Sequence, residues 1–177
     1  KTLVIDAKSG STGAGKKAAE NLLFTEVEGE CLPYKIGAHQ HFPEIQKAVA
    51  AVTGVEIDAH MTTSLLALRR GIIVGIYAHL LPGKSEKDVH QALTEAYQNY
   101  PLVKWGPADT EPNLLSLKKV VGTAETHITY VVKGSKLYLF SCIDNLLKGA
   151  ASQALENLNR ISDWPQEVGV GHLEALS

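Results

Sequence analysis

The longest apolar run of the chain, residues 65–81, restricts the possible folds more than any other feature. Arg69 and Arg70 interrupt this run, and their charges are incompatible with a transmembrane helix. A strand that is buried on both faces of a sheet has a near-continuous apolar sequence. We therefore expect one long central strand over residues 65–81, bent at Gly71 and Gly75.

The remaining patterns predict an α+β domain with a large, mainly antiparallel or mixed sheet and helices on one face. Five further segments have the alternation or the β-branched content of strands: 2–6, 55–61, 114–121, 126–132 and 137–142. The segment between the last two, Lys133 to Ser135, is typical of a hairpin turn. Three segments have helical spacing and a start signal, namely 43–54 with Pro43, 85–99 with a Ser85–Asp88 capping box, and 144–161 with Asp144 as its cap.

The composition fits a single globular domain over residues 1–177, and it argues against some classes of binding partner. A net charge of −2 without a basic stripe argues against nucleic-acid binding. Cys31 and Cys142 make neither a disulfide framework nor a zinc motif, so we expect two reduced thiols in a cytoplasmic protein and no metal. Because Lys1 is not a methionine and leads directly into a strand, we expect the domain to be cut from a longer chain.

The segment from Gly10 to Lys16 has the spacing of a phosphate-binding loop. Lys17 stands where that motif needs a serine or threonine for magnesium, and no segment supplies a convincing Walker B aspartate. We favour a flexible loop whose backbone amides approach a ligand closely, with Lys8 and Ser9 beside it. A plain surface turn is the alternative.

Two histidines, His39 and His41, directly precede the expected helix start at Pro43. The partial positive charge of a helix N-terminus disfavours the imidazolium form, which leaves a neutral imidazole for acid/base chemistry near neutral pH. Glu44 in the first turn is placed to orient one imidazole. Structural histidines are one alternative, and a two-histidine metal site that lacks an obvious third ligand is another.

Arginine inside a doubly buried strand is costly unless it is paired or faces a cavity. Arg69 or Arg70 is therefore expected either to hold an anionic substrate in a cleft or to form a salt bridge across the sheet. Asn145 follows Asp144 at the start of the last helix, and its amide is expected to project outward for recognition of another amide. The alternative is a capped helix with nothing bound.

Four stretches together resemble the N-acetyl-γ-glutamyl-phosphate reductase family in their residues, order and spacing. They are Asp6–Lys16 (DAKSGSTGAGK), His39–Ile45 (HQHFPEI), Arg70–Ile72 (RGI) and Ile143–Ala154 (IDNLLKGAASQA), which is followed by Asn157 and Asn159. The resemblance covers nearly the whole chain, and its first, second and fourth stretches are specific.

Members of this family reduce an acyl phosphate with NADPH to give N-acetylglutamate semialdehyde and phosphate in arginine biosynthesis. The resemblance implies that this chain is the C-terminal domain, similar to that of glyceraldehyde-3-phosphate dehydrogenases, which serves catalysis, substrate binding and dimerisation. The Rossmann domain that binds most of the NADP and the nucleophilic cysteine would lie upstream. The helix over residues 145–161 would pack against that domain, and this fragment alone would be inactive.

The resemblance also implies roles for individual residues. They are His39 as the acid/base that assists the upstream thiolate, His41, Glu44 and Arg70 as substrate-binding residues, and Ser9, Gly10 and Asn145 as cofactor-binding residues, with Asn145 facing the nicotinamide amide.

The chain departs from the family pattern at several positions: Gln40 replaces an arginine, Ser64 a histidine, Ala67 a proline and Ala124 an asparagine. Two alternatives therefore stay open. One is a reductase of a related acyl phosphate, such as aminoadipyl or aspartyl phosphate, and the other is a non-catalytic sheet module used for assembly. Because a large sheet without a second covering layer usually pairs, we expect a homo-oligomer, a dimer or tetramer, formed through the sheet, and no membrane contact.

Overall fold

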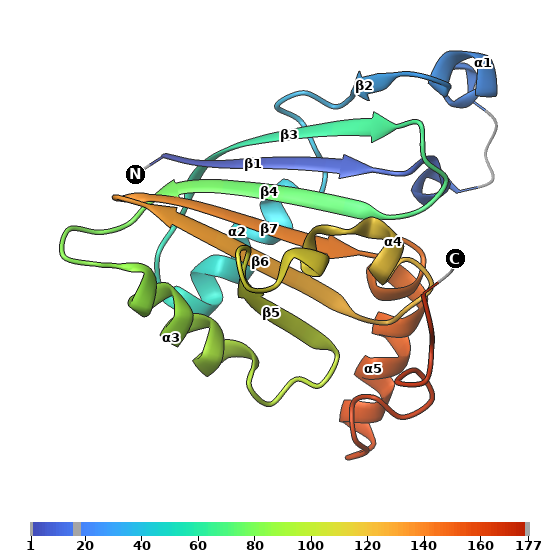
Figure 1. Ribbon diagram of the computed structural model, residues 1–177. Helices are drawn as coiled ribbons and strands as arrows, with labels where there is room; N and C mark the ends of the chain where they lie inside the picture. The colour runs from blue at the N-terminus through green and yellow to red at the C-terminus, as the bar shows by residue number, and fades with distance from the viewer. Residues whose placement is uncertain (1, 16–18, 176–177) are drawn as a thin grey trace.

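A seven-stranded mixed sheet forms the centre of the computed structural model, which describes residues 2–15 and 19–175 (Figure 1). The strands lie in the order β2-β3-β1-β4-β7-β6-β5. Their bounds are β1 Thr2–Ser9, β2 Cys31–Pro33, β3 Asp58–Leu66, β4 Ile72–His79, β5 Val103–Pro107, β6 Thr126–Lys133 and β7 Lys136–Ile143. The longer helices are α2 Phe42–Thr53, α3 Glu86–Tyr97 and α5 Ser152–Ile161. The short helical segments are η1 Ser11–Ala14, η2 Glu20–Leu22, α1 Phe24–Val27, η3 Pro112–Leu115, α4 Leu117–Val120 and the π-helical turn η4 Leu147–Ala151.

The first strand of the chain, β1, lies inside the sheet. It pairs parallel to β3 and antiparallel to β4. Strands β4, β7 and β6 follow in antiparallel order, and β5 pairs parallel to β6. The short strand β2 pairs antiparallel with β3 at the other edge. This arrangement confirms the predicted α+β class with a mixed sheet.

The apolar run over residues 65–81 is not one strand, so that prediction was wrong. It contains the end of β3, a turn over residues 67–71 and all of β4, and β1 lies between these two strands. The turn places Arg69 and Arg70 beyond the end of the sheet, where their charged groups need not be buried. Gly71 closes the turn at φ 107, a backbone conformation that favours glycine.

The expected strand over residues 114–121 was also wrong, because this segment forms the helical turns η3 and α4. Its apolar side chains Leu114 and Val120 are buried, but they pack onto the sheet from two separate turns. Strand β5 was not expected from the sequence. It is five residues long and ends in Gly106 and Pro107, which are residues that usually interrupt a strand.

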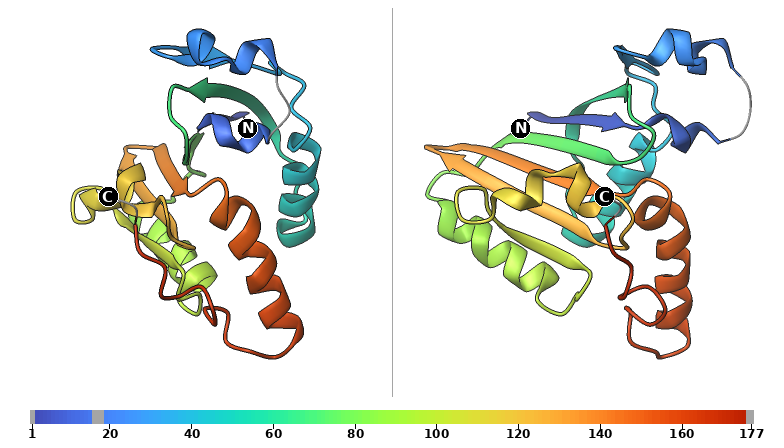
Figure 2. Two further views of the ribbon diagram at one scale, coloured as in Figure 1. Left: turned by 90° about the vertical axis from the view of Figure 1, so that its right-hand side faces the viewer. Right: turned by 45° about the vertical axis from the view of Figure 1, so that its right-hand side comes forward.

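The longer helices share one face of the sheet, as predicted. In Figure 2, α2 and α5 lie on one side of the sheet, and the segment that carries α4 lies on the other. Helix α3 packs on β5 and β6 through Leu93, Ile128 and Tyr130, and a second core cluster joins α5 to the chain end through Leu155 and Val170. The short turns η3 and α4 therefore correct the prediction, because they cover part of the opposite face.

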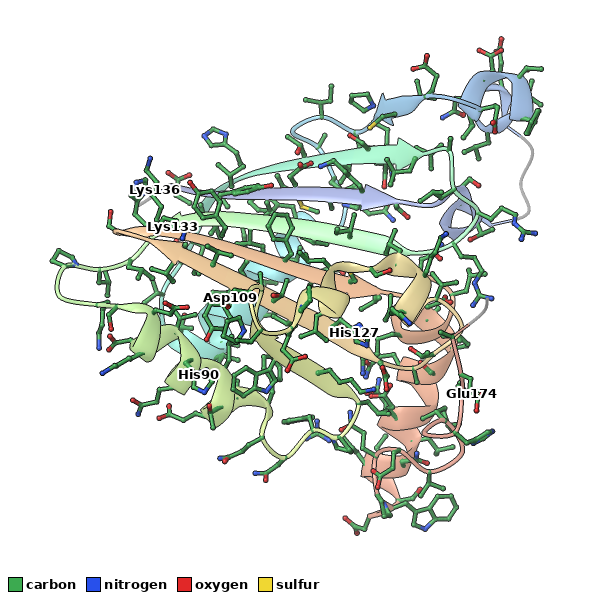
Figure 3. The ribbon with its side chains drawn as sticks, in the orientation of Figure 1. His90, Asp109, His127, Lys133, Lys136 and Glu174 are labelled. Atoms are coloured by element: carbon green, nitrogen blue, oxygen red, sulfur yellow. The ribbon has the colours of Figure 1, made fainter. Side chains whose placement is uncertain are left out.

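Local sequence signals gave three element boundaries correctly. Helix α2 has Pro43 in its first turn, and α3 begins with the capping box of Ser85 and Asp88. The β6–β7 hairpin pairs Lys133 with Lys136. Figure 3 shows these two lysines together at the end of the sheet where the hairpin turns. None of the helices within residues 2–15 and 19–175 has the length and apolar composition that crossing a bilayer requires.

Candidate active site

Three central strands bring the sequence motifs together at one end of the sheet. Ser9 at the end of β1 pairs with Ile72 at the start of β4, which pairs with Ile143 at the end of β7. In Figure 1, β1 and β7 therefore point toward the end of the sheet at which β4 begins. Three segments consequently meet at this end: the loop after β1, the turn over residues 67–71 before β4 (the arginine turn), and the segment after β7.

The loop after β1 is bound tightly to the arginine turn. The N–H groups of Gly10, Ser11 and Thr12 donate to the carbonyl oxygens of Gly71, Leu68 and Arg69, at 2.8, 2.8 and 3.1 Å respectively. A Cβ atom at Gly10 would lie 2.9 Å from the backbone of Arg69, so only glycine fits this close approach. The expectation of a flexible loop with ligand-directed amides is therefore wrong for these three amides, whereas Lys16 and Lys17 lie outside the described residues.

Asn145 does not project outward, which corrects the prediction for this residue. Its side chain is 6% exposed. Its Oδ1 accepts a hydrogen bond from the Gly71 N–H at 2.8 Å, and its Nδ2 donates to Thr12 Oγ1 at 3.0 Å. The amide therefore joins the loop after β1 to the turn before β4, and one Nδ2–H is left for any further partner.

Asp144 holds the same region together through a fully buried carboxylate. Its Oδ2 forms an ion pair with Arg70 Nη2 at 2.6 Å and accepts from the Gly122 N–H at 2.8 Å. Its Oδ1 accepts from the N–H groups of Leu146 and Leu147, which start the last helix. Burial alone would raise the pKa of Asp144, but these hydrogen bonds together hold it below its ordinary value.

The guanidinium group of Arg70 is thus paired with a carboxylate of the protein itself, that of Asp144. Of the two expectations for the arginines, substrate contact or a salt bridge, the salt bridge is the one that the structure contains. The side chain of Arg70 remains 27% exposed, so a substrate contact stays a prediction that must compete with Asp144.

The histidine motif lies at the start of α2, as predicted, but away from the strand ends described above. Tyr34 continues the pairing of β2 with β3 through its N–H, which donates to the carbonyl oxygen of Thr63 at 3.0 Å. The chain then turns through residues 35–41 to Phe42, the first residue of α2. Within the described residues, no hydrogen bond or ion pair joins His39, His41 or Glu44 to the Arg70–Asn145 region.

His39 has the electrostatic character expected of a neutral acid/base. Its ring stands edge-on to the rings of Tyr34 and His41, with centroids 5.8 and 5.1 Å away. Burial, the neighbouring His41 and the charge of Lys35 lower the pKa of His39 below its ordinary value. The His41 N–H donates to His39 Nδ1 at 3.3 Å, a contact that favours the neutral tautomer with its proton on Nε2.

The lowered pKa of His39 was predicted from the helix N-terminus, but the causes in the structure are burial and two nearby basic side chains. His41 is the residue that precedes α2, and Glu44 is exposed in its first turn. Within the described part of the chain, Glu44 makes no hydrogen bond to either histidine, so its orienting role stays a prediction. Residues 2–15 and 19–175 contain no group of three histidine, cysteine or acidic side chains that could hold a metal ion.

A cavity of about 470 Å³ opens beside His39, between the start of α2 and β3. Its lining is mainly apolar with a few polar groups, and it is open to solvent on one side. Its lining includes Ile36, His39, Gln40, Phe42, Pro43 and Met61. Sequence reasoning did not anticipate this cavity, because residues 18–38 lack any regular pattern.

A second ionisable cluster was also missed from the sequence. Glu125 forms an ion pair with Lys104 and a 2.7 Å contact with His127 Nε2. Burial raises the pKa of Glu125, but the hydrogen bonds from Lys104 and His127 outweigh it and lower that pKa. Figure 3 shows His127 on β6, on the opposite half of the sheet from β3. This cluster therefore belongs to neither of the motif regions.

Comparison with known proteins places this geometry in a family. The family model described as "Semialdehyde dehydrogenase, dimerisation domain" matches residues 1–145. N-acetyl-gamma-glutamyl-phosphate reductase of Streptococcus thermophilus is 36% identical over 171 residues, which cover 96% of this chain and 49% of that protein. The protein of the same name from Cyanothece sp. is 36% identical over 175 residues, covering 97% of this chain and 49% of its own length.

Solved structures agree on the fold. Aspartate semialdehyde dehydrogenase from Francisella tularensis superposes with a TM-score of 0.69 at 14% identity, over 90% of this chain and 57% of that one. Aspartate semialdehyde dehydrogenase II from Vibrio cholerae gives a TM-score of 0.67 at 12% identity, over 92% and 55%. The chain therefore spans about half the length of the relatives it matches.

Proposed function

The chain belongs to the semialdehyde dehydrogenase family through its dimerisation domain, and from this premise we propose that it is the C-terminal half of an NADPH-dependent N-acetyl-γ-glutamyl-phosphate reductase. The observation that carries the proposal is the pairing of a neutral His39 with an adjoining cavity on a chain 36% identical to proteins of that name. The protein would be cytoplasmic, in keeping with its two free cysteines, Cys31 and Cys142.

In the proposed reaction, a cysteine thiolate of the upstream half attacks the carbonyl carbon of the acyl phosphate, and phosphate leaves. His39 would be the acid/base of this step. In its neutral form the Nε2–H donates a hydrogen bond or a proton to the oxygen that gains charge during the attack. A pKa below the ordinary value keeps the ring neutral at physiological pH, so it does not need to lose a proton before it can act.

NADP would be bound mainly by the upstream half, and it would supply the hydride that reduces the acyl group to an aldehyde. The residues of this chain would contact the cofactor only at the border of its binding site. Asn145 has one free Nδ2–H that can face a nicotinamide amide, and Ser9 and Gly10 lie in the adjoining loop. The tight backbone approach at Gly10 would fix the position of this loop rather than enclose a phosphate.

The outer face of the last helix supports the proposed contact with the upstream half. Leu158 and Ile161 of α5 are 51% and 83% exposed, and Trp164 just beyond the helix is 57% exposed. Apolar side chains in such a group favour a covering partner. The polar residues Glu156 and Asn159 on the inner side are fully buried, which fixes the direction in which the apolar side faces.

We also propose that two copies pair through the sheet face opposite α2 and α5. Strands β4 and β7 place Tyr77, Tyr138 and Phe140 there, with the Tyr77 ring centroid 6.0 Å from each of the other two. Val4 on β1 extends this surface and is 36% exposed. An aromatic sheet face of this kind is typical of a subunit interface.

The role of His39 is tested by His39→Gln in the full-length protein, with NADPH-dependent release of phosphate from N-acetyl-γ-glutamyl phosphate as the assay. Loss of the acid/base should reduce kcat by about 100-fold or more. His172→Gln, at an exposed histidine near the end of the chain, is the matched control and should leave kcat unchanged. Wild-type turnover by His39→Gln would remove His39 from the mechanism.

A further inference from the structure

Lys35 lies next to the cavity and to His39, and its backbone is strained. Its φ is 46°, in the left-handed region, and Asp163 is the only other described residue besides glycines with a positive φ. Such a conformation is costly for a side chain with a Cβ atom, and residues of this kind cluster at ligand-binding and active sites. Lys35 directly precedes Ile36, which lines the cavity.

The ammonium group of Lys35 contacts Gln40, one of the residues that line the cavity. Lys35 Nζ donates a 2.9 Å hydrogen bond to Gln40 Oε1, and Gln40 lines the cavity together with His39. An ammonium group has three N–H donors, so two remain after this contact. Gln40 is neutral and therefore orients the cation without neutralising its charge.

Two other cations of the predicted site are already paired. Lys8 forms an ion pair with Asp6, and Arg70 forms one with Asp144. Among the ion pairs formed by the described residues, none involves Lys35. Its charge nevertheless acts on His39, because Lys35 contributes, after burial and His41, to the lowered pKa of that imidazole.

We propose that Lys35 is a specificity-determining residue that binds an oxyanion of the substrate at the mouth of this cavity, beside His39. The inference rests on the proposed function, whose substrate carries both a phosphoryl group and a carboxylate. Both are oxyanions that an ammonium group with two free donors can bind, and a charge-assisted hydrogen bond of this type is among the stronger polar contacts. Lys35 would thus take the role that the sequence assigned to Arg70.

The test is steady-state kinetics of the full-length protein in the reverse direction. In that direction the aldehyde, inorganic phosphate and NADP⁺ give acyl phosphate, NADPH and a proton, so the phosphate and the carboxylate-bearing aldehyde can be varied separately. Lys35→Gln should raise one KM by about tenfold or more with a smaller change in kcat. A higher KM for phosphate identifies the phosphoryl group as the ligand, and a higher KM for the aldehyde identifies the carboxylate.

Two variants separate this role from a structural one. Lys35→Arg keeps the charge and should hold that KM close to its wild-type value, whereas Lys47→Gln removes an exposed lysine of α2 and should change neither KM. In Lys35→Gln the acid limb of the pH profile should move to higher pH, because the pKa of His39 loses one of the charges that lowers it. Unchanged KM values for both phosphate and aldehyde in Lys35→Gln would overturn the proposal.

A binding measurement keeps this inference distinct from the proposed function. If the wild-type protein shows no phosphate-dependent reaction with any aldehyde, the proposed function fails. The His39 imidazole resonances are then followed by NMR during separate titrations with inorganic phosphate and with N-acetylglutamate. A shift with either probe in the wild type that is lost in Lys35→Gln supports the oxyanion site, and no shift with either probe in the wild type sinks it.

Discussion

Replacing the buried Asp144 with asparagine should destabilise the fold strongly. Oδ1 of Asp144 accepts from the N–H groups of Leu146 and Leu147 at 2.8 and 3.0 Å. Oδ2 accepts from the Gly122 N–H at 2.8 Å and pairs with Arg70 at 2.6 Å. An asparagine has one oxygen and one NH₂ group, so either orientation of its amide turns a donor toward two other donors.

The expected loss follows from these contacts. Removing one partner of a buried ion pair typically costs about 3–5 kcal/mol, because the remaining charge is left without compensation. Arg70 is partly exposed and can recover some hydration, so we place the loss for Asp144→Asn near the lower end, at about 3 kcal/mol. The assay is urea unfolding at neutral pH, followed by circular dichroism, for the wild type and the variant.

The control for this experiment is Asp58→Asn, an exposed aspartate at the start of β3, which should change the free energy of unfolding by less than about 0.5 kcal/mol. The folded-state pKa of Asp144 lies below its unfolded value, so its contribution is complete above the unfolded pKa and is lost as pH falls through the folded pKa. The difference between wild type and Asp144→Asn should therefore shrink on acidification in that range. If Asp144→Asn is as stable as Asp58→Asn at neutral pH, the account of this carboxylate is refuted.

Three further predictions concern other parts of the fold. Gly10→Ala would place a Cβ atom 2.9 Å from the backbone of Arg69, so it should lower the stability by about 1–3 kcal/mol in the same urea assay, and an unchanged midpoint would show that the loop is not held there. Burial raises the pKa of the Cys142 thiol to about 11, whereas Cys31 is exposed, so iodoacetamide at mildly alkaline pH should label Cys31 in the native protein and Cys142 only after unfolding. Mass spectrometry that finds early labelling of Cys142 would contradict this burial. Tyr138→Glu should reduce the solution mass, measured by light scattering, from that of an oligomer to that of a monomer, and an unchanged oligomer would exclude this sheet face as the interface.

Signals confined to a few neighbouring residues predicted structure well. Pro43 marks the start of α2, and Ser85 with Asp88 starts α3, because a helix start is decided by local hydrogen bonds and by the fixed φ of proline. Asp144 was likewise recognised as a cap, and its Oδ1 accepts from two N–H groups at the start of the last helix.

Contacts between distant segments could not be predicted in the same way. Arg69, Arg70 and Gly71 marked residues 67–71 as unusual, but they did not distinguish a bend within one strand from a break between two strands, because the apolar residues on either side fit both. The direction of Asn145 depends on the Gly71 N–H, which comes from a different part of the sheet. The role proposed for Lys35 rests on a backbone angle and on its contact with Gln40, neither of which has a sequence signal.

The most direct test of the central claim measures the reaction of the full-length protein with three aldehydes. N-acetylglutamate semialdehyde, aspartate semialdehyde and aminoadipate semialdehyde are each supplied with NADP⁺, with and without inorganic phosphate, and NADPH formation is followed. We predict phosphate-dependent NADPH formation with N-acetylglutamate semialdehyde, at a kcat/KM well above that of the other two. A higher kcat/KM for either of the other aldehydes would contradict the substrate assignment, and the absence of phosphate-dependent turnover with all three would contradict the enzymatic function itself.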